Sequence, residues 1–229
     1  VLEAAWQAGA HRIVHTSSLA VNSDTHGQVR DETYRFDGKH VSEYDRTKWM
    51  AHYEVALPLA EAGAPVVIVQ PGVIYGPGDE SGMGRLFRNW LAGRSTPYGA
   101  SSAYCWGHID DTARGIIQAL EHGRVGESYI IAGPHHSLTE AFEIGAEIIG
   151  LRPPRLKVPS AVLDMTAAVL GGLSKLIPAV GGQAELMRTA GATYLGDSAK
   201  ARRELGFEAR SLEEGFAELL PRLRSGQAA

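Results

Sequence analysis

Short apolar runs that alternate with helical segments constrain the fold of this chain more than any other feature of its sequence. Residues 65–70 form a near-continuous apolar run, which is typical of a parallel strand covered by helices on both faces. Residues 12–18 and 128–132 are further strand-like runs. Residues 42–62 and 110–120 carry the capping residues and apolar spacing of helices. This alternation predicts an α/β fold with a doubly wound parallel sheet.

The alternation of strand-like and helical segments ends near Gly150. Helices dominate from Leu151 onward, so we expect the sheet within residues 1–150 and a smaller, mainly helical C-terminal lobe over residues 151–229. The opening residues resemble the end of a helix that stops at Gly9, and the chain is therefore interpreted as a fragment. The amphipathic pattern of residues 212–220 is expected to pack against other elements of the chain or to form a homodimer face.

The composition of the chain indicates which binding partners and which cellular compartment to expect. The net charge of −4 comes without a basic block, so neither nucleic acid nor an anionic membrane surface is expected, and a small molecule is the default partner. Asp164 and Lys175 interrupt the most apolar stretch, which is too short between them to span a membrane. Cys105 is the single cysteine, and with no visible signal peptide a buried thiol in the reducing cytoplasm is expected.

The segment Tyr44-Asp45-Arg46-Thr47-Lys48 carries the most informative chemistry. Four residues apart on a helix, Tyr44 and Lys48 project from one face and can contact a common ligand. A phenol has an ordinary pKa near 10, and an adjacent cation lowers it by favouring phenolate. The pair therefore predicts a tyrosine that exchanges a proton, assisted by the lysine.

A hydroxyl at the end of the neighbouring strand completes the predicted site. Ser18, or failing it Ser17, can hydrogen-bond a substrate oxygen while Tyr44 gives or takes the proton. Together these groups describe the interconversion of an alcohol and a carbonyl. Because no side chain supplies a hydride, this chemistry requires a nicotinamide cofactor.

Five blocks, in order along the chain, resemble the extended short-chain dehydrogenase/reductase family, also called the NAD-dependent epimerase/dehydratase family. The resemblance covers essentially the whole chain and implies a Rossmann-like dinucleotide-binding domain, of which residues 1–150 would be the C-terminal part, with substrate-lobe insertions. The blocks are residues 12–18, 44–48, 70–79, 107–113 and 197–207.

The resemblance assigns roles to individual residues. It implies that Tyr44 is the catalytic acid/base, that Lys48 holds the nicotinamide ribose and tunes Tyr44, and that Ser18 polarises the substrate. Ser17 is the alternative to Ser18.

The same resemblance concerns the loop after the second strand. Pro71, Gly72 and Val73 match a family loop whose backbone lies against the nicotinamide, where glycine permits a close approach. Asp110 and Asp111 match a position interpreted as structural.

Within the family, the sequence is most similar to the dihydroflavonol reductase-like and 3β-hydroxysteroid dehydrogenase-like branch. Residues 21–23 read Val-Asn-Ser where sugar-nucleotide members usually carry Val-Tyr-Gly. The expected activity is thus an NAD(P)-dependent reductase or dehydrogenase acting on a small hydroxyl or ketone substrate. A sugar-nucleotide epimerase or dehydratase is the enzyme alternative, and a cofactor-binding scaffold or sensor is the non-enzyme alternative.

One family element has no counterpart in the sequence. The Gly-x-x-Gly-x-x-Gly turn that places pyrophosphate on a helix N-terminus is absent, as is the residue that selects between NAD and NADP. Either cofactor is therefore expected, and the polypeptide by itself is expected to be inactive.

The histidines and an aromatic segment lead to further expectations. His135-His136 lacks the spacing of a metal site, so no metal is expected, and His108 is expected to make a structural hydrogen bond. Residues 98–106 belong to an irregular region that either faces substrate or packs in the core through Tyr104 and Trp106.

Overall fold

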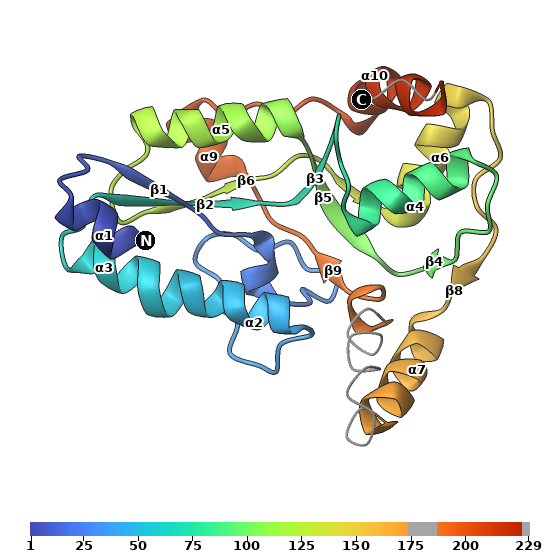
Figure 1. The fold of residues 1–229 in the computed structure, drawn as a ribbon, viewed down its shortest axis with the longest axis horizontal. Helices are drawn as coiled ribbons and strands as arrows, with labels where there is room; N and C mark the ends of the chain where they lie inside the picture. The colour runs from blue at the N-terminus through green and yellow to red at the C-terminus, as the bar shows by residue number, and fades with distance from the viewer. Residues whose placement is uncertain (174–186, 226–229) are drawn as a thin grey trace.

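The computed structural model describes residues 1–173 and 187–225, so Lys175 in the apolar stretch lies outside the described residues. Helices and strands alternate along most of the described chain (Figure 1). In chain order the elements are α1 (Leu2–Gln7), β1 (Ile13–Thr16), η1 (Leu19–Asn22), α2 (Glu43–Met50), η2 (Ala51–Ala56), α3 (Leu57–Glu61), β2 (Val66–Pro71), β3 (Val73–Tyr75), α4 (Gly82–Leu91), β4 (Tyr98–Gly99), β5 (Ala103–His108), α5 (Ile109–His122), β6 (Ser128–Ile131), β7 (His135–Ser137), α6 (Leu138–Ile149), β8 (Lys157–Val158), α7 (Ser160–Leu173), β9 (Thr193–Tyr194), α9 (Ala199–Leu205) and α10 (Leu212–Arg224).

A parallel sheet of three strands, in the order β1-β2-β6, forms the central layer. Every residue of β2 is buried. Val67 and Val69 belong to one apolar cluster with α5 and α9, while Val66 and Ile68 pack against α3 from the other face. Figure 1 shows α5 on one side of this sheet and α2 with α3 on the other. The predicted α/β fold with a parallel sheet covered on both faces is confirmed.

A second group of strands extends from the first sheet. β5 pairs in parallel with β3 and β9 and antiparallel with β7. The expectation of an irregular segment up to Gly107 was therefore wrong, since β5 spans Ala103–His108. The run Ala-Tyr-Cys-Trp-Gly-His has little β-branched character, and it becomes a strand because neighbours pair with it on both edges.

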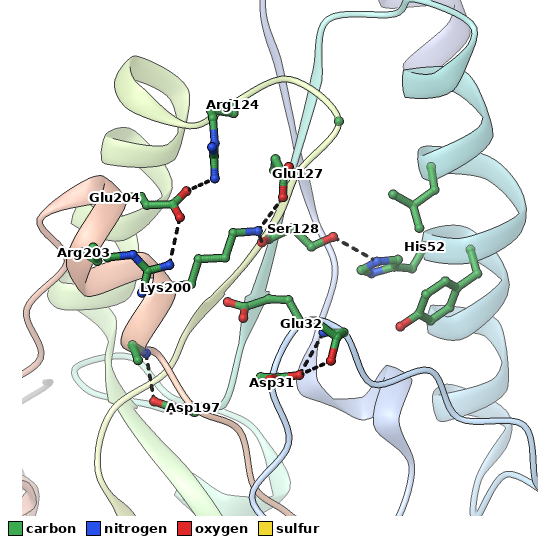
Figure 2. A pocket seen from close by; sticks show the side chains of 15 residues that line it. Asp31, Glu32, His52, Arg124, Glu127, Ser128, Asp197, Lys200, Arg203 and Glu204 are labelled. Carbon is green, nitrogen blue, oxygen red and sulfur yellow. Dashed lines mark hydrogen bonds and ion pairs between the residues drawn. The ribbon is translucent and has the colours of Figure 1, made fainter.

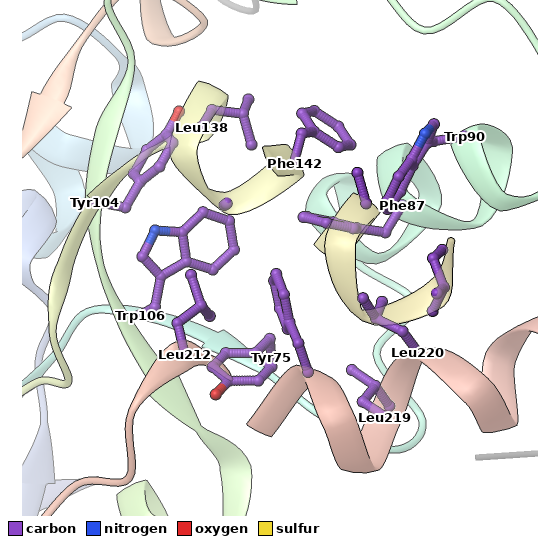
Figure 3. Close-up of a cluster of buried hydrophobic side chains, with 14 of the residues drawn as sticks. Tyr75, Phe87, Trp90, Tyr104, Trp106, Leu138, Phe142, Leu212, Leu219 and Leu220 are labelled. Carbon is purple, nitrogen blue, oxygen red and sulfur yellow. The ribbon is translucent and has the colours of Figure 1, made fainter. Parts of the chain in front are cut away.

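An aromatic cluster holds α4, α6 and α10 against the second group of strands (Figure 3). Phe87 stacks on Phe142 with ring centroids 4.8 Å apart, and Phe216 of α10 contacts Phe87 and Trp106 edge-on. Residues 98–106 were expected either to face substrate or to pack in the core. Trp106 packs in the core, since it is 1% exposed. The apolar face predicted for residues 212–220 is used within the chain, packing on α6.

The chain returns to the sheets after α7. β9 pairs with β5, and α9 packs on β6 and α5, where Ala201 is fully buried. Residues 193–195 also contact the loop after η1, because Thr25 donates its backbone N–H to the carbonyl of Thr193 at 2.8 Å. Segments from both ends of the sequence therefore meet beside the first sheet.

Within residues 1–173 and 187–225, no helix combines the length and the apolarity that crossing a membrane requires.

The aromatic cluster predicts the effect of truncating Phe216. Replacing this buried ring by alanine leaves a cavity that α4, α6 and α10 share, and we expect Phe216→Ala to lower the free energy of unfolding by about 3–5 kcal/mol. Urea denaturation followed by far-ultraviolet circular dichroism measures the change. The control is Met165→Ala on the exposed side of α7, expected to change it by less than about 0.5 kcal/mol. Equal losses in the two variants would contradict the assigned core.

Candidate active site

A cavity of about 730 Å³ opens beyond the carboxyl ends of β1 and β2. In parallel sheets this edge is where ligands bind. Ser18 follows β1, Gly72 and Val73 follow β2, and all three line the cavity together with Tyr44 of α2. Residues far apart in the sequence therefore meet at one sheet edge. The remaining lining residues are Leu19, Ala20, Ser42, Asp45, Ile74, Ser81, Gly82, Met83, Tyr104, Thr189 and Tyr194.

Tyr44 and Lys48 leave α2 on the same face. The Lys48 ammonium lies 5.8 Å from the centroid of the Tyr44 ring and 3.4 Å from the carbonyl oxygen of Thr16. Ser42 caps the helix by accepting a hydrogen bond from the Asp45 backbone N–H, which fixes where the first turn begins. Tyr44 remains 54% exposed, so its phenol is accessible from the cavity.

The two candidate serines have different surroundings. Ser18 lines the cavity, and its Oγ accepts a hydrogen bond from the Ala20 backbone N–H at 3.1 Å. Because this bond uses an oxygen lone pair, the hydroxyl hydrogen can still be donated to a ligand. Ser17 is buried, and its Oγ lies 2.9 Å from Nδ1 of His52. Ser18, and not Ser17, therefore lines the cavity that Tyr44 also lines.

His52 is a buried residue that was not predicted from the sequence as part of the site. It lies in the π-helical segment η2, and its Nε2 is 3.2 Å from the hydroxyl of Ser128 on β6. Through Ser17 and Ser128 the imidazole joins the helix of Tyr44 and Lys48 to the residue that follows β1 and to β6. Its position one further turn beyond Lys48 was a usable signal, because residues four apart share a helix face. Burial lowers the pKa of His52 to about 4, with smaller effects from His15 and Arg35.

The loop after β2 contributes to the cavity through Gly72 and Val73, while Pro71 is the buried last residue of β2. A Cβ atom at Gly72 would lie 2.2 Å from the carbonyl oxygen of Cys105. Glycine at this position is therefore required by packing against β5, whatever ligand occupies the cavity. Cys105 itself is fully buried, as expected from the sequence.

The block that begins at Gly107 forms a structural junction. His108, expected to make a structural hydrogen bond, accepts the Asp110 backbone N–H at 3.2 Å and so caps α5. Asp110, the first residue of the helix predicted over residues 110–120, was expected to be its cap, and this detail was wrong. Asp111 is buried and pairs with Arg210 at 2.9 Å, which joins α5 to the segment before α10.

A second cavity, of about 560 Å³, lies between α9 and η2 (Figure 2). Its charged side chains bind one another: Lys200 pairs with Glu127 and Arg124 with Glu204, each at 2.6 Å. Glu32 accepts the backbone N–H of Ile130 at 2.8 Å. These groups are engaged in holding α9 and the loop after η1 against β6. In the part of the chain that the structure describes, no three His, Cys, Asp or Glu side chains gather as metal ligands would.

Comparison with known proteins identifies the family. Residues 1–132, more than half of the chain, match the family model described as the NAD dependent epimerase/dehydratase family. The chain belongs to this family. The expected resemblance to the extended short-chain dehydrogenase/reductases is thereby confirmed.

Individual relatives agree with the family assignment. The chain is 28% identical to the sterol demethylase protein B of Methylococcus capsulatus over 95% of its own length and 68% of that protein. It is 26% identical to the 3-beta-hydroxysteroid dehydrogenase of Mycolicibacterium neoaurum, covering 96% of this chain and 64% of that one. The crystal structure of gox2253 superposes with a TM-score of 0.84 at 27% identity, covering 100% of this chain and 71% of that one. The chain thus spans about two thirds of the length of these curated relatives.

The cavity suits the nicotinamide end of the family's cofactor. Ser18, Tyr44 and Lys48 offer a hydroxyl, a phenol and an ammonium at one sheet edge, and such groups bind ribose hydroxyls and a carboxamide. The backbone of Gly72 and Val73 provides a wall of the same cavity. The residues present therefore fit the nicotinamide ribose of NAD.

The buried His52 predicts a dependence of stability on pH. Its folded-state pKa of about 4 lies below the ordinary 6.5, so the unfolded chain binds more protons between these values. The stability contributed by neutral His52 is complete above pH 6.5 and decreases as pH falls toward 4, by about 3 kcal/mol in all.

Denaturation of the wild type and His52→Gln at pH 7.0, 5.5 and 4.5 measures this contribution. The advantage of the wild type over the variant is expected to shrink with falling pH, whereas His11→Gln at an exposed position should match the wild-type slope. Parallel pH profiles for wild type and His52→Gln would contradict the assignment.

Proposed function

We propose that the full-length protein is an NAD(P)-dependent oxidoreductase that interconverts a hydroxyl and a ketone on a small organic substrate. The observation that supports this most is the shared cavity of Ser18 and Tyr44, with Lys48 on the same helix face as the tyrosine. These are the groups that an alcohol–carbonyl interconversion requires. A reducing cytoplasm, where Cys105 stays a thiol, is the proposed location.

Each residue has a defined task in the proposed reaction. Tyr44 donates its phenolic proton to the substrate oxygen during reduction and recovers a proton during oxidation. Ser18 donates a hydrogen bond to the same oxygen and stabilises the negative charge that develops there. Lys48 binds the ribose and stabilises the Tyr44 phenolate by its charge. The nicotinamide, when bound, donates or accepts the hydride.

The lining of the cavity favours an uncharged and largely apolar substrate. Leu19, Val73, Ile74 and Met83 contribute apolar surface, and no lysine or arginine is among the described lining residues. A sugar nucleotide carries a diphosphate, which proteins usually bind with such cations. The composition therefore supports a ketone or alcohol substrate over the epimerase or dehydratase alternative, in agreement with the steroid-related names of two relatives.

The acid/base role predicts the behaviour of Tyr44→Phe. Loss of the phenolic hydroxyl should lower kcat by about a hundredfold or more while the melting temperature stays unchanged. The assay is nicotinamide absorbance during a screen of the full-length protein on aromatic ketones, steroids and sugar nucleotides. Tyr53→Phe is the matched control, because Tyr53 follows on the same continuous helix outside this cavity. A loss below about tenfold in Tyr44→Phe would rule out the assigned role, and turnover of sugar nucleotides alone would establish the alternative function.

The different surroundings of the serines predict opposite effects of two alanine substitutions. Ser18→Ala should lower kcat by about tenfold to a thousandfold with little change in stability, because its hydroxyl acts on substrate. Ser17→Ala should instead reduce the free energy of unfolding by about 1–3 kcal/mol, because it leaves Nδ1 of buried His52 without a partner while Ser128 still contacts Nε2. Steady-state kinetics and urea denaturation of both variants test the assignment. The reverse pattern would make Ser17 the catalytic serine.

A further inference from the structure

Asp45, the residue after Tyr44, is a buried carboxylate held by three hydroxyl groups. Its side chain accepts hydrogen bonds from Ser42 Oγ at 2.8 Å, from Ser23 Oγ at 3.2 Å and from Tyr194 Oη at 3.1 Å. The residue is 1% exposed and lies at the wall of the candidate active site. One side chain therefore joins the start of its own helix to two segments that are distant in sequence.

Each donor belongs to a segment that contributes to the cavity. Ser23 follows η1, whose first residues line the cavity beside Ser18. Ser42 caps α2, the helix of Tyr44. Tyr194 belongs to β9, and its ring stacks on that of Tyr104 with centroids 6.2 Å apart and planes at 7°. The carboxylate thus joins the serine side, the tyrosine side and the aromatic wall of one cavity.

The chemistry of these contacts is that of hydrogen bonding to neutral groups. In the described part of the chain, Asp45 forms no ion pair with a lysine or an arginine, and the three hydroxyls offset the cost of burying its charge. Burial raises the pKa of Asp45, against the opposing effect of these bonds. Burial and the neighbouring carboxylate also raise the pKa of Tyr194, so its phenol stays protonated and can donate.

A purely local role explains part of this arrangement. Asp45 is the third residue of α2, and its exchange of hydrogen bonds with Ser42 resembles the capping found at many helix starts. Capping requires neither Ser23 nor Tyr194. Ser23 is fully buried with a backbone φ of 50°, a conformation that is unfavourable for a residue with a side chain, and its bond to Asp45 helps to hold it there.

We propose that Asp45 is a positioning residue of the candidate active site, which sets Tyr44 relative to Ser18 and acts through its hydroxyl hydrogen bonds and not through its charge. The inference rests on the proposed function for its kinetic consequence. The structural consequence is independent of the proposed function. It is that residues 18–25 and 192–196 need the hydrogen bonds of Asp45 to keep their conformation. The two consequences can be measured separately.

The test compares Asp45→Asn and Asp45→Leu in the full-length protein. The amide can accept from Ser42 and can donate to the oxygens of the other two hydroxyls, whereas leucine has similar size and no polar atom. We expect Asp45→Asn to keep kcat within about threefold of wild type, and Asp45→Leu to lower kcat by about tenfold to a hundredfold, as misplaced catalytic groups do. Tyr194→Phe, which removes one donor and keeps the ring, should lower kcat by a smaller factor.

Controls separate misplacement from loss of folded protein. Asp37→Asn and Asp37→Leu make the same replacements in an exposed loop and should leave kcat and KM unchanged. All variants are assayed below their melting temperatures, where the protein is folded. A lower kcat then reflects the placement of Tyr44 and Ser18 and not a loss of folded protein. If Asp45→Leu does not fold, Asp45→Asn and Tyr194→Phe still decide the question.

Hydrogen–deuterium exchange gives a readout that needs no substrate. Thr25 and Leu195 each donate a backbone N–H across the junction of these segments. Faster exchange in peptides from residues 18–25 and 192–196 is expected in Asp45→Leu and Tyr194→Phe, but not in Asp45→Asn.

The outcomes are distinct. An equal loss of kcat in Asp45→Asn and Asp45→Leu would show that the charge of Asp45 acts, and would overturn the proposal. Wild-type kcat and wild-type hydrogen–deuterium exchange in both Asp45→Leu and Tyr194→Phe would overturn it as well. Altered exchange together with an active Tyr44→Phe variant would refute the proposed function and leave the positioning role of Asp45 in place.

Discussion

Parallel pairing of β1 with β2 is the constraint on which the candidate site depends. Because the two strands run in the same direction, both end at one edge of the sheet, and the residues that follow them meet there. Ser18 and Gly72 are separated by more than fifty positions in the sequence, yet they line the same cavity. Antiparallel pairing would have placed them at opposite edges.

Buried polar contacts then fix the helix of Tyr44 and Lys48 against this edge. His52 bonds to Ser17 and Ser128 from the sheet side of the helix, and Asp45 bonds to three hydroxyls near its start. Apolar packing alone is tolerant of small displacements, whereas hydrogen bonds between buried groups demand specific distances and angles. Such contacts are suited to holding catalytic groups in register, and they explain why polar residues occupy interior positions so close to the cavity.

Much of the first sheet could be predicted because its strands are locally distinctive. Residues 65–70 are apolar on both faces, and residues 42–62 begin with a serine cap and continue with helical spacing. The strand at Ala103–His108 escaped prediction because its stability comes from partners on both edges and not from its own residue types. His52 and Asp45 were missed for a related reason, since a histidine or an aspartate on a helix is ordinarily a surface residue.

The sequence by itself determined the alternation of strands and helices, the common helix face of Tyr44 and Lys48, and the family to which the chain belongs. These are properties of local spacing and of motif order, which a linear sequence contains in full. The tertiary structure decided that Ser18 opens onto the cavity while Ser17 turns toward His52, and that Tyr194 reaches the carboxylate of Asp45. Adjacent serines have nearly the same local preferences, so only the packing of distant segments around them separates a residue that faces the cavity from one that is buried.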